Sequence, residues 1–136
     1  MAKLRHLALH SANLQATADF YKRVFDMKEV GRNTTAVSEG IYLSDGTLNL
    51  TILQPTVPLP EFGKFAGSAE LGISHFGFLV EDVEETNRRL GEVGAVHIEQ
   101  HLAGLVHSED KWKGPDGVLF DVTDQGWTGA LPLGKE

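Results

Sequence analysis

Two stretches of this chain repeat one pattern of residues, and the repeat limits the folds that the chain can adopt. LRHLALHSANLQATADFYKRV starts at residue 4 and ISHFGFLVEDVEETNRRLGEV at residue 73, so that His6 aligns with His75 and Asn13 with Asp82. In each stretch an apolar, strand-like run is followed by a residue type that commonly caps helices, and then by apolar residues at helical spacing. The repeat predicts two similar modules, each beginning with a strand and a helix.

Three further extended runs complete each module and give it a β-α-β-β-β order. They cover 27–33, 36–43 and 47–54 in the first module, and 95–101, 105–112 and 117–123 in the second. An Asp-Gly pair precedes the last run of both modules, as expected for a tight turn between strands. We therefore expect an α+β protein with one domain over residues 1–136, made of module one (3–54), a connector (55–71), module two (72–124) and a C-terminal tail (125–136). The connector contains Pro and Gly without clear periodicity, and we expect a long loop that closes over a site.

Composition excludes several classes of function. The chain has no cysteine, so a metal would have to be bound by His, Asp, Glu or neutral oxygens. A net charge of −7 argues against nucleic acid as a partner, because an acidic surface repels phosphate. No apolar run approaches the 18 residues of a membrane span, and the N-terminus has no signal-peptide pattern. We expect a cytoplasmic protein that binds a small molecule and neither nucleic acid nor a membrane.

The two repeated histidines are candidate metal ligands. Because side chains of a strand alternate, Leu7 and Leu9 of the first strand would face the helices, and His6 would face the other way. The same alternation in the second module turns His75 away from its helix. The residues two positions further along, Ala8 and Gly77, are small and leave space beside each histidine. A lone strand histidine is usually structural, but two at equivalent positions beside small residues indicate a site.

The last strand of module two supplies a candidate carboxylate. In GVLFDVTD the apolar residues Val118, Phe120 and Val122 alternate, so Asp121 faces the same side as the histidines. An unpaired carboxylate is costly to bury there, and a metal cation would remove that cost. The predicted ligand set is therefore His6, His75 and Asp121.

Other residues are predicted to surround this site. Asn49 and Thr51 face it from the last strand of module one and would supply a neutral oxygen where a fourth ligand could bind. His10 would lie at the mouth of the pocket. His107 could act as acid or base or contact the substrate. Tyr42 and Trp112 are aromatic residues expected in the wall or core.

These motifs resemble the vicinal oxygen chelate superfamily of glyoxalase I, methylmalonyl-CoA epimerase, extradiol dioxygenases and bleomycin-resistance proteins. The resemblance rests on LRHLALHSANLQATADFYKRVF, GISHFGFLVEDVEET and KGPDGVLFDV and covers roughly residues 4–124. It implies an eight-stranded mixed sheet curled into a cup, metal ligands at His6, His75 and Asp121, and a homodimer. Many isomerases of the superfamily have a fourth ligand, Glu or Gln, on the last strand of module one, where this chain has Asn49 and Thr51.

Three functions remain open at this point. Two His and one carboxylate with open positions are typical of non-haem Fe(II) oxygenases, which favours an Fe(II)- or Mn(II)-dependent dioxygenase acting on a small oxygen-chelating substrate. The first alternative is an isomerase or lyase in which Zn(II), Ni(II) or Co(II) stabilises an enediolate, with His107 or an unligated Asp121 as base. The second is a metal-free protein that sequesters a ligand, as bleomycin-resistance proteins do. The dioxygenase is preferred because module one offers no carboxylate as a fourth ligand or base.

Overall fold

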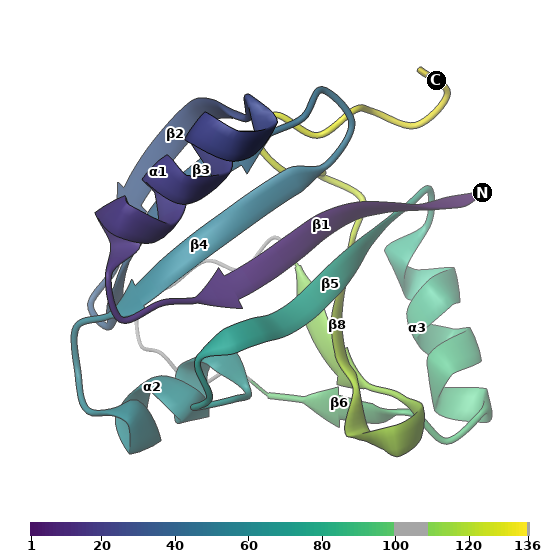
Figure 1. Ribbon diagram of the computed structural model, residues 1–136. Helices are drawn as coiled ribbons and strands as arrows, with labels where there is room; N and C mark the ends of the chain where they lie inside the picture. Colours follow the sequence, from purple (N-terminus) through teal and green to yellow (C-terminus); the bar gives the residue numbers. More distant parts are fainter. Residues whose placement is uncertain (100–108, 136) are drawn as a thin grey trace.

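The computed structural model describes residues 1–99 and 109–135 of the protein. Among them, eight strands form one mixed sheet in the order β2-β3-β4-β1-β5-β8-β7-β6, which curls into an open cup (Figure 1). The strands are β1 (Ala2–His10), β2 (Lys28–Thr34), β3 (Ser38–Ser44), β4 (Asn49–Pro55), β5 (Gly72–Val80), β6 (Val96–Ile98), β7 (Asp110–Lys113) and β8 (Leu119–Thr123). The α+β class expected from the repeat and the mixed eight-stranded sheet implied by the family resemblance are confirmed.

The strand order has an internal two-fold relationship that follows from the repeat. At the centre, β1 and β5 run antiparallel, and they are the first strands of the two modules. On one side β1 pairs in parallel with β4, and on the other β5 pairs in parallel with β8. The first and last strands of each module therefore lie side by side in the middle of the cup, where the predicted ligands are located.

Each module covers the convex face of its half of the sheet with one helix. Helix α1 (Leu14–Phe25) begins at Asn13, whose side chain accepts a hydrogen bond from the Ala16 N–H at 3.1 Å. Helix α3 (Val83–Glu92) begins at Asp82 in the same way, with the Glu85 N–H as donor at 3.0 Å. Such caps satisfy backbone N–H groups that the first turn of a helix leaves free. Both capping residues predicted from the repeat are confirmed.

Two apolar clusters lie between these helices and the sheet. Under α1 the cluster consists of Leu9, Leu14, Ala18, Ile41, Leu43, Leu50 and Ile52. Under α3 it consists of Val80, Trp112 and Val122, with Phe78 and Phe120 packed against them. The helix-facing residues of β1, β5 and β8 are thus those that strand alternation predicts, and the opposite residues face the inside of the cup.

The connector differs from the loop that the sequence predicts, because it contains helix α2 (Leu59–Ala66) directly after Pro58. Phe62 and Ala66, four residues apart on one face, are buried. That helix seats Phe62 against His10, with ring centroids 4.8 Å apart. The spacing of Phe62, Phe65 and Ala66 is helical, but only two turns long, which is too short for periodicity alone to distinguish from a loop.

In module two, β6 is shorter than predicted and β7 covers the end of its predicted range. The run expected at 95–101 is a three-residue strand, and that expected at 105–112 is observed from Asp110, with 105–108 outside the described residues. A 3₁₀ turn over Pro115–Gly117 precedes β8. The three strands that follow α1 in module one agree with their predicted ranges within two residues.

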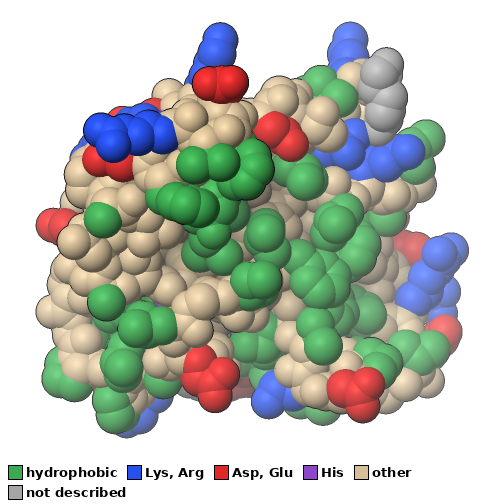
Figure 2. Space-filling model, viewed as in Figure 1, with side chains coloured by type: hydrophobic (Ala, Val, Ile, Leu, Met, Phe, Trp, Pro, Cys, Tyr) green, Lys and Arg blue, Asp and Glu red, His purple; other side chains and the backbone are tan. Residues whose placement is uncertain are grey.

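Hydrophobic side chains gather in the middle of the convex face, between α1 and α3 (Figure 2). Strand β1 and helix α1 contribute exposed large hydrophobic residues, among them Leu4, Phe20, Val24 and Phe25. Within the described part of the chain, no helix is long and apolar enough to cross a membrane.

Candidate metal centre

Strand pairing places the predicted ligands in two adjacent rows across the floor of the cup. His6 of β1 lies between Asn49 of β4 and Gly77 of β5, and Gly77 in turn pairs with Asp121 of β8. In the next row, His75 of β5 pairs with Ala8 of β1. Each histidine therefore faces a small residue across the central strand pair, which leaves the floor of the cup open between the two rings.

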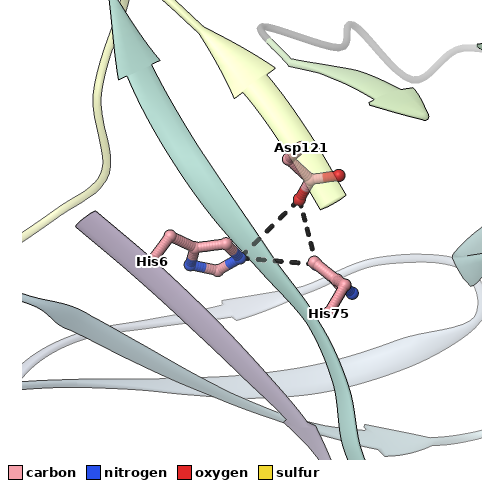
Figure 3. Close-up of side chains that lie close together, drawn as sticks. All are labelled: His6, His75 and Asp121. Carbon is pink, nitrogen blue, oxygen red and sulfur yellow. Dashed lines mark hydrogen bonds and ion pairs between the residues drawn. The ribbon is translucent and has the colours of Figure 1, made fainter. Parts of the chain in front are cut away.

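Three ligand atoms converge above this floor (Figure 3). His75 Nε2 lies 2.9 Å from Asp121 Oδ2 and 3.4 Å from His6 Nε2, and the third separation, His6 Nε2 to Asp121 Oδ2, is 3.7 Å. Two ligands that are each about 2.1 Å from one ion lie roughly 3.0–3.4 Å apart at bond angles of about 90–109°. The observed separations are close to this range, so that one divalent cation could contact all three atoms.

Asn49 orients His6 toward this point. Its Oδ1 lies 2.7 Å from His6 Nδ1, and it also accepts a hydrogen bond from the Thr51 hydroxyl at 2.7 Å. Its Nδ2 donates to the Thr128 carbonyl at 2.8 Å, which fixes the orientation of the amide. His6 Nδ1 must therefore carry the proton, and its Nε2 presents a lone pair toward His75 and Asp121. Metal-bound histidines commonly have a partner of this kind on the other nitrogen.

Ser74 holds the second histidine with its hydroxyl 2.8 Å from His75 Nδ1. Because a hydroxyl can donate or accept, it suits both tautomers of the ring. With the proton on Nε2, His75 can donate toward Asp121; with the proton on Nδ1, Nε2 is free to ligate. Burial, with His75 alongside, lowers the pKa of His6 to about 4, which keeps that ring neutral and able to ligate at neutral pH.

Lys111 of β7 neutralises the carboxylate. Its Nζ lies 2.6 Å from Asp121 Oδ1, and both side chains are at most 2% exposed. Burial disfavours ionisation of Asp121, but contacts with His75 and Lys111 outweigh it and hold the pKa of this carboxyl below its ordinary value. Asp121 Oδ2, the atom that faces the two rings, is buried and has no well-directed hydrogen bond among the described residues. A buried anionic oxygen beside two ring nitrogens, the nearer one 2.9 Å away, fits a bound cation.

A cavity of about 290 Å³ opens beside the site and is lined by His6 and His75. Its walls come from both modules and from α2, which contributes Phe65 and Ala66. Tyr42 and Thr51 line it as predicted, and so do Asn33, Thr35 and Ser38, so that the module-one wall is mainly polar. The cavity is close to the lower end of the range for ligand sites, which favours a small ligand.

Sequence reasoning missed Glu109, Lys111 and Trp127, all of which line this cavity. Trp127 Nε1 donates to Glu109 Oε2 at 2.8 Å. Burial and the adjacent Asp121 carboxylate raise the pKa of Glu109 to about 7, so module two brings a second carboxyl group to the site. One signal was present in the sequence: if Trp112 packs under the helix as Phe120 does, alternation turns Lys111 and Glu109 into the cup.

Two other predicted pocket residues lie elsewhere, and a third is not described. Trp112 does not line the cavity; it pairs with Phe120 in the core under α3 and donates to Asn87 Oδ1 at 3.1 Å. His10 is buried under α2, where its Nδ1 lies 3.0 Å from the Glu70 carbonyl, and is not at a pocket mouth. The short helix that the sequence did not predict covers it. His107 lies outside the described residues.

The cup of two βαβββ modules is the fold of the vicinal oxygen chelate class. The chain belongs to the Glyoxalase/Bleomycin resistance protein/Dioxygenase superfamily, whose family model matches residues 3–122. The resemblance inferred from the repeated motifs is thereby confirmed. No curated protein matches the chain in sequence.

Several solved structures share the fold at low sequence identity. Hypothetical protein BH1468 from Bacillus halodurans C-125 is 21% identical, with a TM-score of 0.68 over 89% of this chain and 92% of its own. Methylmalonyl-CoA epimerase in complex with methylmalonyl-CoA and NH4+ is 17% identical, with a TM-score of 0.69 over 90% and 93%. A mutant of 4-hydroxymandelate synthase from Streptomyces coelicolor is 20% identical, with a TM-score of 0.68 over 95% of this chain and 51% of that one. These similarities concern the fold.

Proposed function

We propose that the protein is a metal-dependent dioxygenase that holds Fe(II) or Mn(II) with His6, His75 and Asp121 and acts on a small substrate with two neighbouring oxygens. The proposal rests on the three ligand atoms within 3.7 Å of one another and on the cavity that His6 and His75 line. Two His and one carboxylate with open positions form the ligand set associated with non-haem Fe(II) oxygenases.

The observation that carries the proposal is the residue at position 51. Thr51 pairs with Ala8 as Asp121 pairs with Gly77, so Thr51 occupies in module one the place that Asp121 occupies in module two. Its hydroxyl donates to Asn49 Oδ1, and that oxygen also pairs with His6 Nδ1. Both neutral oxygens of the module-one strand are therefore engaged with each other and with His6. This arrangement supports a three-residue ligand set that is open on the module-one side.

The chain's own residues would then bind and orient the reactants. Lys111 holds one oxygen of Asp121, which leaves the other for the metal. The polar wall of Asn33, Thr35, Ser38 and Tyr42 offers hydrogen-bonding partners for a substrate. A bound Fe(II) or Mn(II) would supply the positions at which substrate oxygens and O₂ are brought together.

Reconstitution tests this proposal. Metal-free protein is given Fe(II) under anaerobic conditions, then candidate vicinal diols or hydroxy-keto compounds, and then O₂. We expect O₂ uptake with Fe(II) or Mn(II) and none with Zn(II), and we expect Asp121→Ala to abolish both metal retention and uptake while Asp121→Glu retains the metal. Zn(II) or Ni(II) in the purified protein would not decide the question, because bare affinity follows the Irving–Williams order. Turnover that is independent of O₂ would refute the dioxygenase.

Glu109 supports a second candidate, an isomerase or lyase that moves a proton on a carbon next to a carbonyl. Its carboxyl lines the cavity, and burial with the adjacent Asp121 raises its pKa to about 7, which is the range in which a general base works well at neutral pH. Module two thus supplies the base that module one lacks.

The two candidates make opposite predictions in deuterated water. The isomerase incorporates solvent deuterium into the substrate carbon with Ni(II), Co(II) or Zn(II), needs no O₂, and loses exchange in Glu109→Gln while keeping its metal. The dioxygenase shows no such exchange. A third function, ligand sequestration without metal, would be indicated if the purified protein neither retains nor takes up any divalent metal.

A further inference from the structure

The C-terminal strap, residues 124–131, returns from module two to module one across the candidate site. It follows β8 directly, and it lies beyond residue 122, where the match to the family model ends. Four hydrogen bonds of 2.7–2.9 Å tie it to module one: Asn49 Nδ2 to the Thr128 carbonyl, Ser44 Oγ to the Gly129 carbonyl, Leu131 N–H to the Thr47 carbonyl, and Arg5 Nε to the Leu131 carbonyl. Gly129 has a φ of +81°, and a Cβ there would lie 2.8 Å from Val30, so the strap is closely fitted to its path.

The strap places an indole directly on a predicted metal ligand. Trp127 stacks on His6 with ring centroids 4.7 Å apart and planes inclined by 6°. The same ring donates from Nε1 to Glu109 Oε2 at 2.8 Å. Trp127 therefore connects a candidate ligand of module one to the second carboxyl group of module two.

Gly77 makes this contact possible. It pairs with His6 across the central strands, and a Cβ at this position would lie 2.6 Å from Trp127 Cζ2 and 3.1 Å from His6 Cβ. Both distances are shorter than ordinary van der Waals contacts, and the atoms of Trp127 belong to a rigid ring. Any side chain at position 77 would push the indole away from the imidazole.

We propose that Trp127 is a positioning residue for the metal site, because it holds the His6 ring in the plane in which Nε2 faces His75 and Asp121. The inference rests on the proposed metal site. The second torsion of a histidine side chain is soft, so a hydrogen bond from Nδ1 to Asn49 alone leaves the ring free to tilt. The strap limits that motion twice, through the stacked indole on the ring and through Thr128, whose carbonyl holds the Asn49 amide.

The stack also couples to metal binding. The face of an indole attracts positive charge, and an imidazole gains positive character when its Nε2 binds a divalent cation. The contact between Trp127 and His6 is therefore stronger in the metal-bound protein than in the metal-free one. Partners that orient ligating side chains typically change metal affinity by about 10–100-fold when removed, and we expect a loss in this range for a residue that cannot stack.

The test uses full-length protein and Co(II) as the probe. Trp127→Leu should raise the Kd for Co(II) by about 10–100-fold and change the visible absorption bands of the bound ion. Trp127→Phe, which can still stack, should recover most of the affinity. Trp112→Phe is the matched control, because Trp112 is buried under α3 and does not line the cavity; it should bind Co(II) like the parent even where its melting temperature is lower.

Fluorescence and NMR give readouts that a purely structural role would not change. The chain has two tryptophans, so Co(II) should quench the emission of Trp112→Phe, which retains Trp127 on His6, more strongly than that of Trp127→Phe. In metal-free protein, nitrogen NMR should show His6 protonated at Nδ1 in the parent and a mixture of tautomers in Trp127→Leu. Thermal unfolding of each variant confirms that it is folded.

The outcomes separate this inference from the proposed function. If folded Trp127→Leu binds Co(II) as tightly as the parent, with the same absorption bands, Trp127 does not position the ligand and the metal site stands. If the parent binds no Co(II) but Trp127→Leu alters the tautomer of His6, the positioning role stands and the metal site is wrong. If neither Co(II) affinity nor the tautomer responds to Trp127→Leu, the inference is overturned.

Discussion

Replacing Lys111 with Met tests the charge balance at the centre of the site. Its Nζ lies 2.6 Å from Asp121 Oδ1, and neither side chain is more than 2% exposed. Met matches the length of the lysine stem but carries no charge, so Lys111→Met leaves a buried carboxylate without its main partner. Removing one member of a buried ion pair typically costs about 3–5 kcal/mol, because the other charge stays desolvated.

For Lys111→Met we expect a cost at the lower end of the range for breaking a buried ion pair, because Asp121 keeps a second partner. His75 Nε2 lies 2.9 Å from Asp121 Oδ2 and can donate a proton toward the carboxylate in the metal-free protein. We therefore expect a loss of about 3 kcal/mol in the free energy of unfolding, which for a chain of this size lowers the melting temperature by roughly 10 °C.

Lys111→Met should strengthen metal binding although it lowers the stability of the metal-free protein. A lysine ammonium and a divalent ion roughly 6 Å apart repel each other by about 1.4 kcal/mol even at the dielectric constant of water. Removing the ammonium should therefore tighten Zn(II) binding by at least about tenfold. The bound ion also takes over the neutralisation of Asp121, so saturating Zn(II) should stabilise the variant more than the parent.

Thermal unfolding with EDTA and with excess Zn(II), together with competition against a chromophoric chelator, measures both effects. Lys113→Met is the control, because Lys113 lies two residues along the same strand and is exposed. It should change neither quantity. A Lys111→Met protein that melts with the parent in EDTA would show that the ion pair is not buried, and one that binds Zn(II) less tightly would show that Lys111 supports the metal through some contact other than Asp121.

Three further predictions address the ligands and their environment. His6→Ala and His75→Ala should each abolish metal binding, measured by metal content, while circular dichroism shows a folded protein; retained metal with lost stability would indicate structural histidines. Asn49→Leu should weaken metal binding by about 10–100-fold, because His6 loses the partner that selects its tautomer. Competition titration measures the affinity, and an unchanged value would show that Asn49 does not orient His6. Metal-free protein should lose stability as the pH falls from 6.5 toward 4, because the pKa values of His6 and His10 are lowered to about 4 and the unfolded chain protonates first. The raised pKa of Glu109 acts in the opposite sense between about 7 and 4.5, so urea unfolding of Glu109→Gln should show a steeper dependence on pH than the parent.

The sequence predicts the floor of the cup well, because the floor depends on the simplest rule of a strand. Once His6 and His75 are aligned, alternation alone turns them and Asp121 away from the helices, and the sheet brings them within 3.7 Å. Strand pairing brings these residues together, because parallel pairing within each module and antiparallel pairing between modules place them in adjacent rows. No knowledge of loops is required.

The walls of the cup could not be predicted in this way. Trp127 comes from a segment without periodicity, and its position depends on hydrogen bonds between the strap and module one that no local pattern encodes. Lys111 lies on β7 and Glu109 directly precedes that strand, and charged residues at such positions normally indicate solvent. The burial of Lys111 follows from Asp121, which needs a cation nearby, and such a compensation is visible only when the side chains are seen together.

The two modules are not exactly symmetric, and this difference leaves the candidate ligand set open on the side of module one. A perfect repeat would place a carboxylate on both last strands, at position 51 as well as position 121, and two carboxylates with two histidines would surround an ion on both sides. In this chain position 51 is a threonine, whose hydroxyl donates a hydrogen bond to Asn49, and Asn49 orients His6. Module one therefore orients a ligand and module two supplies the charge, with Lys111 and Glu109 behind it. The open side that results lies toward the polar wall of module one, and a substrate that chelates through two oxygens would have to bind there.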